Sequence, residues 1–429
     1  RYGKEYHKYK AWMYKTEHLS FDELCSINTS SFLDFVRYAV ENVEFYKEFY
    51  RKVDLGTFKS SEDIRKLPIL TKDLFRINLN RIYTVKSSKG IPVHTGGTTG
   101  TPLMILYTKD DIQKRNAILD FYREKFGFRN KMQRATFSGR IIIPMNYDGN
   151  VFWRHNYALN QKLYSTFHLR TENLKYYIDN LNRFQPKIID GFPSAIYMIA
   201  QYILERSIEL TFSPLVIFTT SETLYEYQHE IMEKAFKCKV ANQYASSEGA
   251  PFVVECPYGI LHFDLRSGII EDDPEYGALI TSFTTHGTPL IRYAIGDKIE
   301  FSENGDTQSR CACGSPNPIV KSIYGRTQDY VLSSERGKVG VGIVDIFKKI
   351  PPIVKQSQII QNNIDELCLY LAMDTPELSK EYEDKIINEI KNRMGNSVKV
   401  NIIVCDHIQP EPNGKTPFIK NMLINRNTV

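Results

Sequence analysis

The chain has 429 residues, of which 42% are hydrophobic and 24% are charged. This many apolar residues can bury a substantial core, so the composition excludes a disordered chain and predicts two domains or a large domain with a smaller one attached. The net charge is only +5 and the basic residues form no block. Nucleic acid is therefore not expected as a partner.

The apolar runs are strand-sized, as in residues 215–218, and none approaches the roughly 20 residues needed to cross a bilayer. Residues 1–10 (RYGKEYHKYK) contain no apolar segment of the signal-peptide kind. We therefore expect a cytoplasmic protein with no membrane span. Seven cysteines are too few for a disulfide framework. The scattered ones are expected to be ordinary buried residues: Cys25, Cys238, Cys368 and Cys405.

Residues 1–90 are predicted to form a helical lead-in, because residues 31–40 space their apolar side chains at helical intervals and residues 60–64 resemble a helix start. From residue 91 to residue 301, short apolar strands alternate with helical stretches. Strands are expected at 187–191, 214–218 and 277–281, and a helix is expected at 224–236. This alternation predicts an α/β domain.

A segment rich in Gly, Pro, Ser and Cys, residues 304–326, marks a change in composition. We therefore predict a mixed α and β fold with a large N-terminal domain over 1–326 and a small α+β domain over 327–429. The elements expected in the small domain are a helix at 343–349, strands at 358–361, 367–373 and 398–405, and a helix at 378–393.

The stretch 94–104 (HTGGTTGTPLM) is a loop of glycines and threonines between two apolar runs. Glycine lets backbone N–H groups turn towards an anion and threonine adds hydroxyl donors, so the loop suits phosphate. It is not a Walker P-loop, because the lysine that this motif requires is absent. A plain hairpin or surface loop would explain the composition equally well.

Further short motifs follow this loop in a fixed order. They are TSETL (220–224), QYASSEG (243–249), LIRYAIGD (290–297), YGRTQD (324–329) and NGKTP (413–417). Each is weak evidence alone because short motifs match by chance, but the ordered set makes coincidence improbable. The series resembles that of the adenylate-forming enzymes, the superfamily of acyl-CoA synthetases, firefly luciferase and peptide-synthetase adenylation domains.

Within that superfamily the chain is similar to the phenylacetate–CoA ligase group, and especially to its CapK branch from surface-polysaccharide clusters. The residues that carry this narrower resemblance are ENVEFY (41–46), LPILTK (67–72), DGFPSA (190–195), and Glu255-Cys256 followed by GILH (259–262). They lie outside the common nucleotide motifs, so they help to choose the branch.

The resemblance implies a ligase that joins a carboxylate to the α-phosphate of ATP, releases pyrophosphate and passes the acyl group to a nucleophile. Charge develops on the α-phosphate in the transition state, so such a site needs a metal, hydrogen-bond donors and a cation. By the family pattern, the glycine- and threonine-rich loop would hold the outer phosphates of ATP. Its residues are Thr95, Gly96, Gly97, Thr98, Thr99, Gly100 and Thr101.

The same pattern implies roles for residues in the other motifs. Glu248 would coordinate Mg²⁺ through a hard carboxylate oxygen, which suits that ion. Lys415, on a mobile small domain, would neutralise charge during adenylation, and Gln328 lies where the family has its hinge. The remaining nucleotide-binding roles would fall to Ser221, Glu222 and Tyr244 around the adenine, Asp297 on the ribose, and Arg326 near the ribose and phosphate.

Simpler interpretations of these motifs stay open. Asp297 could close a turn, and Glu248 could be a solvated loop carboxylate. Lys420 could take the role of Lys415, because the residues after Lys415 depart from the usual basic continuation. Thr101 stands where many relatives carry lysine, which weakens binding of ATP unless Mg²⁺ or a basic residue such as Arg140 compensates.

The sequence also contains a candidate zinc site. Cys256 and His262 form C-x5-H, and Cys311 and Cys313 form C-x-C. Three thiolates and one imidazole satisfy tetrahedral Zn²⁺, and closed sites of this kind are normally structural. Members of the resembled group carry a similar set. The alternatives are unrelated loop residues or a Cys311–Cys313 disulfide, which a cytoplasmic setting disfavours.

The leading hypothesis is an ATP-dependent ligase of capsule or lipopolysaccharide biosynthesis, acting on a small-molecule carboxylate with an amine, sugar or thiol acceptor. A phenylacetate-type ligase that uses CoA is the first alternative. The second is a non-catalytic nucleotide-binding protein of the same fold, which Thr101 in place of lysine supports. The aromatic N-terminal helices could form a homodimer face.

Overall fold

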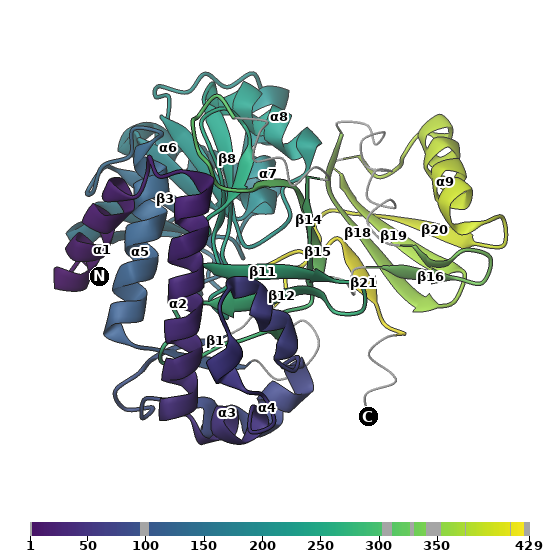
Figure 1. Ribbon diagram of the computed structural model, residues 1–429. Helices are drawn as coiled ribbons and strands as arrows, with labels where there is room; N and C mark the ends of the chain where they lie inside the picture. The colour runs from purple at the N-terminus through teal and green to yellow at the C-terminus, as the bar shows by residue number, and fades with distance from the viewer. Residues whose placement is uncertain are drawn as a thin grey trace. The chain divides into compact units, whose positions relative to one another are not determined.

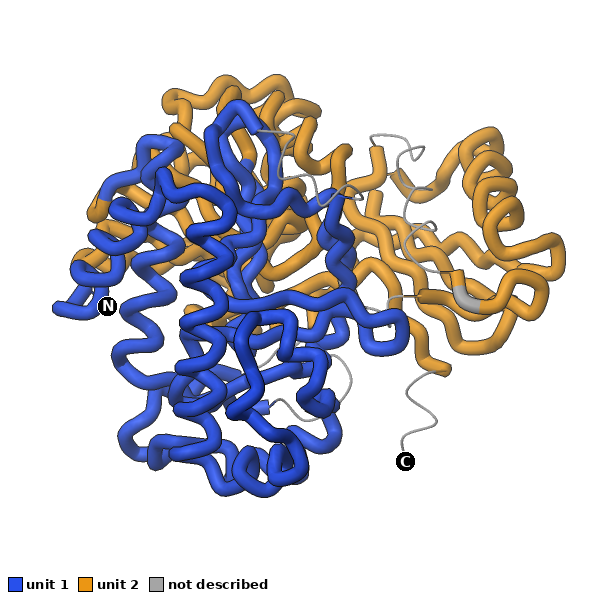
Figure 2. The backbone as a smooth tube through the Cα atoms, viewed as in Figure 1, with its two compact units in different colours: residues 1–129, 241–324 blue, residues 130–240, 325–429 orange. Residues whose placement is uncertain are grey.

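The computed structural model describes residues 2–94, 103–302, 311–326, 330–339, 353–373, 375–411 and 413–423. The chain divides into two compact units (Figure 2). Unit 1 comprises residues 1–129 and 241–324, and unit 2 comprises residues 130–240 and 325–429. The chain enters unit 2 for the second time at residue 325, close to the predicted domain boundary at residue 326, which stays a prediction.

Unit 1 begins with helices that pack over its strands (Figure 1). They are α1 (Lys4–Lys15), α2 (Phe21–Asn42), α3 (Glu44–Phe49) and α4 (Lys72–Ile82), with the 3₁₀ helices η1 (Leu55–Thr57) and η2 (Ser61–Lys66) and, further on, α5 (Lys109–Glu124). Helix α2 starts at a capping box in which Ser20 and Glu23 each satisfy the other's backbone N–H. Its buried face, which includes Phe32 and Phe35, joins the core of the unit.

The strands of unit 1 form antiparallel pairs. They are β1 (Ile91–His94), β2 (Met104–Tyr107), β8 (Lys239–Tyr244), β9 (Val253–Glu255), β10 (Leu261–Phe263), β11 (Gly268–Asp273), β12 (Gly277–Ser282), β13 (Tyr293–Ala294), β14 (Asp297–Phe301) and β15 (Ile319–Arg326). Strand β1 pairs with β2. A small sheet has the strand order β11-β12-β13, and a further run of neighbouring strands has the order β14-β15-β10-β9-β8. Two of the site residues predicted in this unit, Tyr244 and Asp297, lie at the end of β8 and at the start of β14.

The first half of unit 2 is a parallel α/β layer in the order β7-β6-β3-β5, with β4 antiparallel at the edge. Its strands are β3 (Arg134–Ser138), β4 (Trp153–Asn156), β5 (Gln161–Ser165), β6 (Ile188–Gly191) and β7 (Val216–Thr220), and its helices are η3 (Tyr157–Leu159), α6 (Thr171–Phe184), α7 (Pro193–Glu205) and α8 (Glu226–Phe236). The central strands β6 and β7 are almost wholly buried, as expected of a parallel sheet covered on both faces. The α/β prediction is confirmed here.

The second half of unit 2 is the small α+β part. It contains β16 (Val331–Ser333), β17 (Gly337–Val339), β18 (Val354–Asn363), β19 (Glu366–Met373), α9 (Lys380–Met394), β20 (Lys399–Cys405) and β21 (Ile419–Asn421). Helix α9 lies along the sheet β20-β19-β18-β21 (Figure 1) and buries Ile386, Ile390 and Met394 against it. The three predicted strands and the helix predicted at 378–393 are present, whereas β16, β17 and β21 were not predicted. The helix expected at 343–349 lies outside the described residues.

Two predictions from composition can be compared directly with the structure. Among the described residues, no helix combines the length and the apolar character needed to span a membrane.

The scattered cysteines are half-buried, so the expectation that they are buried was wrong. They are Cys25, Cys238, Cys368 and Cys405. The apolar pattern places each of them near the core, but a small side chain at the margin of a layer keeps part of its surface exposed.

Candidate active site

Two predicted nucleotide-binding residues meet in unit 1. Tyr244 is the last residue of β8 and Asp297 is the first residue of β14. The Tyr244 hydroxyl donates a hydrogen bond of 2.8 Å to Oδ2 of Asp297. Both side chains are half-buried. Asp297 therefore does more than close a turn, because its carboxylate is oriented by a residue from a distant motif.

Glu248 lies in a tight turn that follows β8. The Gly249 N–H donates to the carbonyl oxygen of Ser246 at 3.0 Å, and the Ala250 N–H donates to Ser246 Oγ at 3.2 Å. Only 7% of Glu248 is exposed, so the alternative of a solvated loop carboxylate was wrong. Within the described part of the chain its carboxylate makes no hydrogen bond or ion pair, so its oxygens are available to a ligand.

In unit 2, Glu222 is bound to the beginning of helix α7. Its Oε2 accepts a hydrogen bond of 3.1 Å from the backbone N–H of Ser194, next to Pro193 at the first turn of the helix. A carboxylate is favourable there because the first N–H groups of a helix have no partner within it. Ser221, just before it, is exposed and adopts a left-handed φ of 72°.

Burial dominates the electrostatics of Glu222. It raises the pKa of this carboxyl above its usual range, although the hydrogen bond from Ser194 and the charge of Lys415 oppose the shift. The second oxygen, Oε1, is buried and has no hydrogen-bond partner among the described residues. Glu222 and Lys415, taken from two separate motifs, are therefore close enough to interact.

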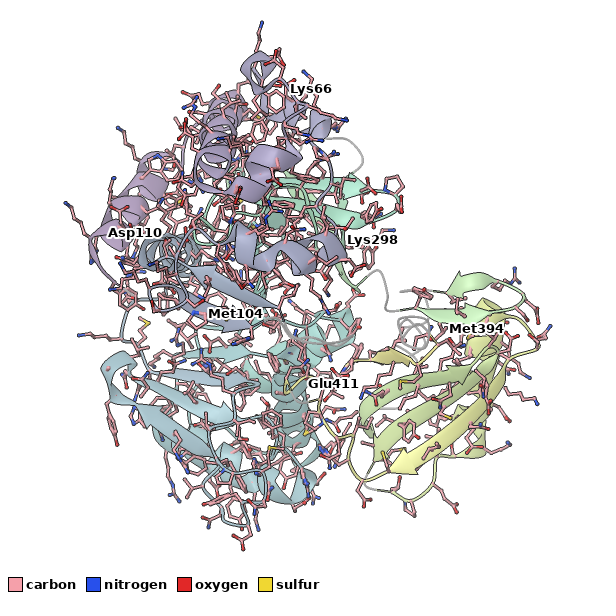
Figure 3. All side chains as sticks on the ribbon, turned by 90° about the horizontal axis from the view of Figure 1, so that it is seen from below. Lys66, Met104, Asp110, Lys298, Met394 and Glu411 are labelled. Carbon is pink, nitrogen blue, oxygen red and sulfur yellow. The ribbon has the colours of Figure 1, made fainter. Side chains whose placement is uncertain are left out.

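Lys415 is presented by a short turn at residues 411–415. The Gly414 N–H donates to the Glu411 carbonyl oxygen at 2.7 Å, and the Lys415 N–H donates to Asn413 Oδ1 at 2.9 Å. Glu411, labelled in Figure 3, marks the start of this turn. The Lys420 ammonium, which was the alternative to Lys415, pairs with Oε1 of Glu411 at 3.6 Å and so helps to hold the turn.

Two glycines let this turn pack closely against the end of strand β3. A Cβ atom on Gly139 would lie 1.9 Å from the carbonyl oxygen of Asn413, and a Cβ on Gly414 would lie 2.4 Å from Cα of Gly139. Neither approach is possible with a side chain, because real Cβ contacts are never that short. Arg140, the suggested source of compensating charge, follows this contact and is exposed.

The four predicted zinc ligands come together in unit 1. One ligand atom from each of Cys256, His262, Cys311 and Cys313 lies within 4.8 Å of all the others. The Sγ atoms of Cys256 and Cys311 are 3.6 Å apart, and Sγ of Cys313 is 3.4 Å from Nε2 of His262. Tetrahedral zinc with bonds of about 2.3 Å to sulfur requires separations of about 3.8 Å, so the set fits the ion.

The surroundings of the cluster also suit a metal. Nδ1 of His262 lies 3.2 Å from the carbonyl oxygen of Asn317, which favours a proton on Nδ1 and leaves Nε2 as a ligand. The backbone N–H groups of Cys313 and Ser315 point at the sulfurs of Cys311 and Cys313. All the cysteines are free, so the alternative of a Cys311–Cys313 disulfide was wrong. Burial raises the pKa of Cys313 to about 12 and lowers that of His262.

Several predicted residues lie where the structure gives no side-chain geometry. The phosphate loop, Thr95 to Thr101, and the hinge residue Gln328 are outside the described residues. Arg326 ends strand β15, and only its place in the backbone is described. Their roles stay predictions.

The sequence reasoning missed two residues that shape the site. The first is Ser194, whose N–H binds Glu222 and which lies in the stretch 190–195 that carries the narrower family resemblance. The Pro193-Ser194 pair at a helix start was the available signal. The second is Gly139, and nothing in the local sequence indicates that Asn413 approaches it.

The chain matches known proteins over most of its length. It is 36% identical to the protein CapK of Staphylococcus aureus over 93% of this chain and 90% of that protein. It is 23% identical to a phenylacetate–coenzyme A ligase of Thermus thermophilus, over 94% of this chain and 95% of that one. Residues 331–422 match the family model of the CapK C-terminal domain.

Solved structures agree about the fold. A crystal structure of 2-hydroxyisobutyryl-CoA ligase, in complex with 2-HIB-AMP, superposes with a TM-score of 0.75 at 16% identity, over 96% of this chain and 93% of that one. The fold is that of the adenylate-forming ligases of the acyl-CoA synthetase superfamily. Within that class, the chain belongs to the CapK family.

We predict that Gly139→Ala loosens the turn that carries Lys415. Overpacking of this kind typically costs about 1–3 kcal/mol, so the amides of Gly414 and Lys415 should exchange with solvent roughly 10- to 100-fold faster. Hydrogen–deuterium exchange measures this. The control is Gly149→Ala, where the added Cβ meets only the side chain of Tyr147, which can rotate away. Unchanged exchange in Gly139→Ala would show that the close contact is not maintained.

We predict that Glu222 lowers the stability of the protein as the pH rises. A carboxyl whose pKa is raised on folding binds its proton more tightly in the folded state, so stability is lost between the unfolded and the folded pKa values as the pH increases. In Glu222→Gln this loss is absent. The melting temperature of the variant minus that of the wild type should therefore increase as the pH rises from the ordinary carboxyl pKa of about 4.5 through the raised pKa of Glu222. A difference that stays flat or decreases would contradict the assignment.

Proposed function

We propose that the protein activates a small-molecule carboxylate with ATP and Mg²⁺, releases pyrophosphate, and transfers the acyl group from the acyl-adenylate to an acceptor. The observation that carries this proposal is the packing of the 411–415 turn against Gly139, which brings Lys415 close to Glu222. Membership of the CapK family supports it. We also propose that the large domain ends at residue 326 and that the small domain moves during the reaction.

Each predicted site residue has its own role in this proposal. Glu248 offers Mg²⁺ a buried carboxylate with free oxygens, and the ion would supply charge for the phosphates. Asp297, oriented by Tyr244, accepts hydrogen bonds from the ribose hydroxyls, and Arg326 binds near the ribose and phosphate. Lys415 neutralises the charge that develops at the α-phosphate. The remaining nucleotide-binding roles fall to Ser221, Glu222 and residues 95–101, with Gln328 as the hinge.

The acceptor distinguishes the candidate reactions. From the CapK resemblance we assign the reaction to capsule or lipopolysaccharide biosynthesis, with an amine or a sugar as acceptor, in the cytoplasm. The second candidate is an aryl-CoA ligase, which the phenylacetate–coenzyme A ligase relative favours. A non-catalytic nucleotide-binding protein is the third, favoured by Thr101 in place of lysine. We propose separately that the chain forms a homodimer through its aromatic N-terminal helices, which include α1.

We also propose that Cys256, His262, Cys311 and Cys313 hold one structural Zn²⁺. The ion would join the β9–β10 hairpin to the turn that precedes β15, in a closed site without an open position for substrate. Its contribution is to stability, because it links segments that are far apart in the sequence.

The reaction is tested by incubating the protein with ATP, Mg²⁺ and a panel of carboxylates while pyrophosphate is measured. Adding CoA, amino acids or amino sugars then separates the two ligase hypotheses by the product formed. Nucleotide binding without pyrophosphate across a broad panel would contradict the enzyme and favour the binding protein.

We predict that Lys415→Ala reduces pyrophosphate formation about 100-fold or more, because a cation aimed at developing charge is worth that much in comparable sites. ATP affinity, measured by calorimetry, should change less than about threefold, since the cation acts mainly in the transition state. Lys420→Ala is the control, because its ammonium pairs with Glu411. Normal adenylation in Lys415→Ala with loss in Lys420→Ala would reverse the two roles.

We predict one equivalent of zinc per chain by elemental analysis of purified protein. Cys313→Ser should lose most of the metal and lower the melting temperature by several degrees, because removing one thiolate leaves an incomplete site. Cys238→Ser, outside the cluster, should retain the metal. Protein that is fully folded and contains no stoichiometric zinc would exclude the site.

A further inference from the structure

Arg115 of helix α5 holds the turn that follows Glu248. Its Nη1 donates to the carbonyl oxygen of Gly249 at 2.9 Å and of Ala250 at 3.2 Å, and Nη2 donates to Ala250 again at 3.2 Å. Nη1 also donates to Oγ1 of Thr284 at 3.0 Å. One side chain thus links the turn, a helix and a neighbouring hairpin of unit 1.

A second contact holds the same turn from the other side. The Tyr107 hydroxyl donates to the carbonyl oxygen of Ser247 at 2.9 Å. Gly249 has a φ of 93°, and a Cβ there would lie 2.6 Å from the Tyr107 hydroxyl oxygen. The carbonyl groups on both sides of Glu248 are therefore fixed by side chains of the β2–α5 segment. The carboxylate between them has no partner among the described residues.

The surroundings of Arg115 differ from those of an arginine that forms a buried ion pair. In the described part of the chain it forms no ion pair, and its guanidinium lies 4.5 Å from the ring centroid of Phe252. Arg266, another arginine of the unit, is 3% exposed and pairs with the carboxylate of Asp264 at 2.9 Å. The half-buried guanidinium feels the charge of Asp111 on the same helix, but it gives its hydrogen bonds to the turn and to Thr284 and none to a carboxylate of the described residues.

We propose that Arg115 is a positioning residue that preorganises Glu248 for Mg²⁺ before the nucleotide binds. This inference rests on the proposed function. Its guanidinium is planar and donates in a fixed fork, so it can hold two successive carbonyl oxygens and a hydroxyl at once. A turn fixed in this way presents the Glu248 carboxylate in one orientation, which reduces the entropy lost when a metal ion binds.

The test compares Arg115→Lys with Arg266→Lys, since each keeps its charge and loses the planar fork. Without metal, the Gly249 and Ala250 amides of Arg115→Lys should exchange with solvent roughly tenfold faster than in the wild type. With ATP present, its affinity for Mn²⁺, measured by electron paramagnetic resonance, should be weaker by about tenfold, the effect typical of residues that orient metal ligands. Arg266→Lys should lower the melting temperature and change neither quantity.

The outcomes separate this inference from the proposed function. Wild-type exchange and Mn²⁺ affinity in Arg115→Lys, with only a lower melting temperature, would reduce Arg115 to a structural role and overturn the inference alone. A wild-type protein that binds no Mn²⁺ with ATP would overturn the proposed function, and the inference with it. If Arg115→Lys does not fold, Tyr107→Phe takes its place, because it removes only the hydroxyl that holds Ser247. We then expect faster amide exchange and weaker Mn²⁺ affinity, each by a smaller factor than for Arg115→Lys. No shift would overturn the inference.

Discussion

Close approach of backbone to backbone at strand ends is the constraint on which the rest of the site depends. Gly191 ends β6 with a φ of 147°, and a Cβ there would lie 1.9 Å from the carbonyl oxygen of Phe137. This contact sets the start of helix α7, whose N–H binds Glu222. Gly139 makes the same kind of contact beneath the turn that carries Lys415, whereas Gly249, beside Glu248, lies close to the side chains of Thr285 and Tyr107. A side chain at any of these positions would move a functional residue.

Charged groups in the site are held mainly by backbone and by neutral side chains. Glu222 accepts from a helix N–H, Asp297 accepts from a phenol, and Arg115 donates to carbonyl oxygens. Opposite charges also act on two of these groups, Lys415 on Glu222 and Asp111 on Arg115, but the hydrogen bonds named here come from or go to uncharged partners. Weaker dipolar partners orient the group and keep its charge available, which is the arrangement that electrostatic catalysis requires. Burial then strengthens every interaction that a ligand makes.

Apolar periodicity was enough to locate most elements, because it records which face of each segment is buried. The strands near residues 187–191 and 277–281 and helix α9 match their predicted positions within a few residues. The exposure of the scattered cysteines was mispredicted, since residue type says little about how far a side chain at the edge of a layer projects. The alternative of a solvated Glu248 was wrong, because burial of a loop carboxylate is set by packing that the local sequence does not record.

The sequence by itself determined the family, the mixed α and β class and the identity of the candidate ligands, because motif order and residue chemistry are written along the chain. The tertiary structure alone decided that Cys256 and His262 meet the thiols of Cys311 and Cys313, that Tyr244 orients Asp297, and that Lys415 lies close to Glu222. Such contacts join residues separated by tens to hundreds of positions. No local pattern specifies them, because they depend on how whole layers pack and on where glycine lets the backbone come close.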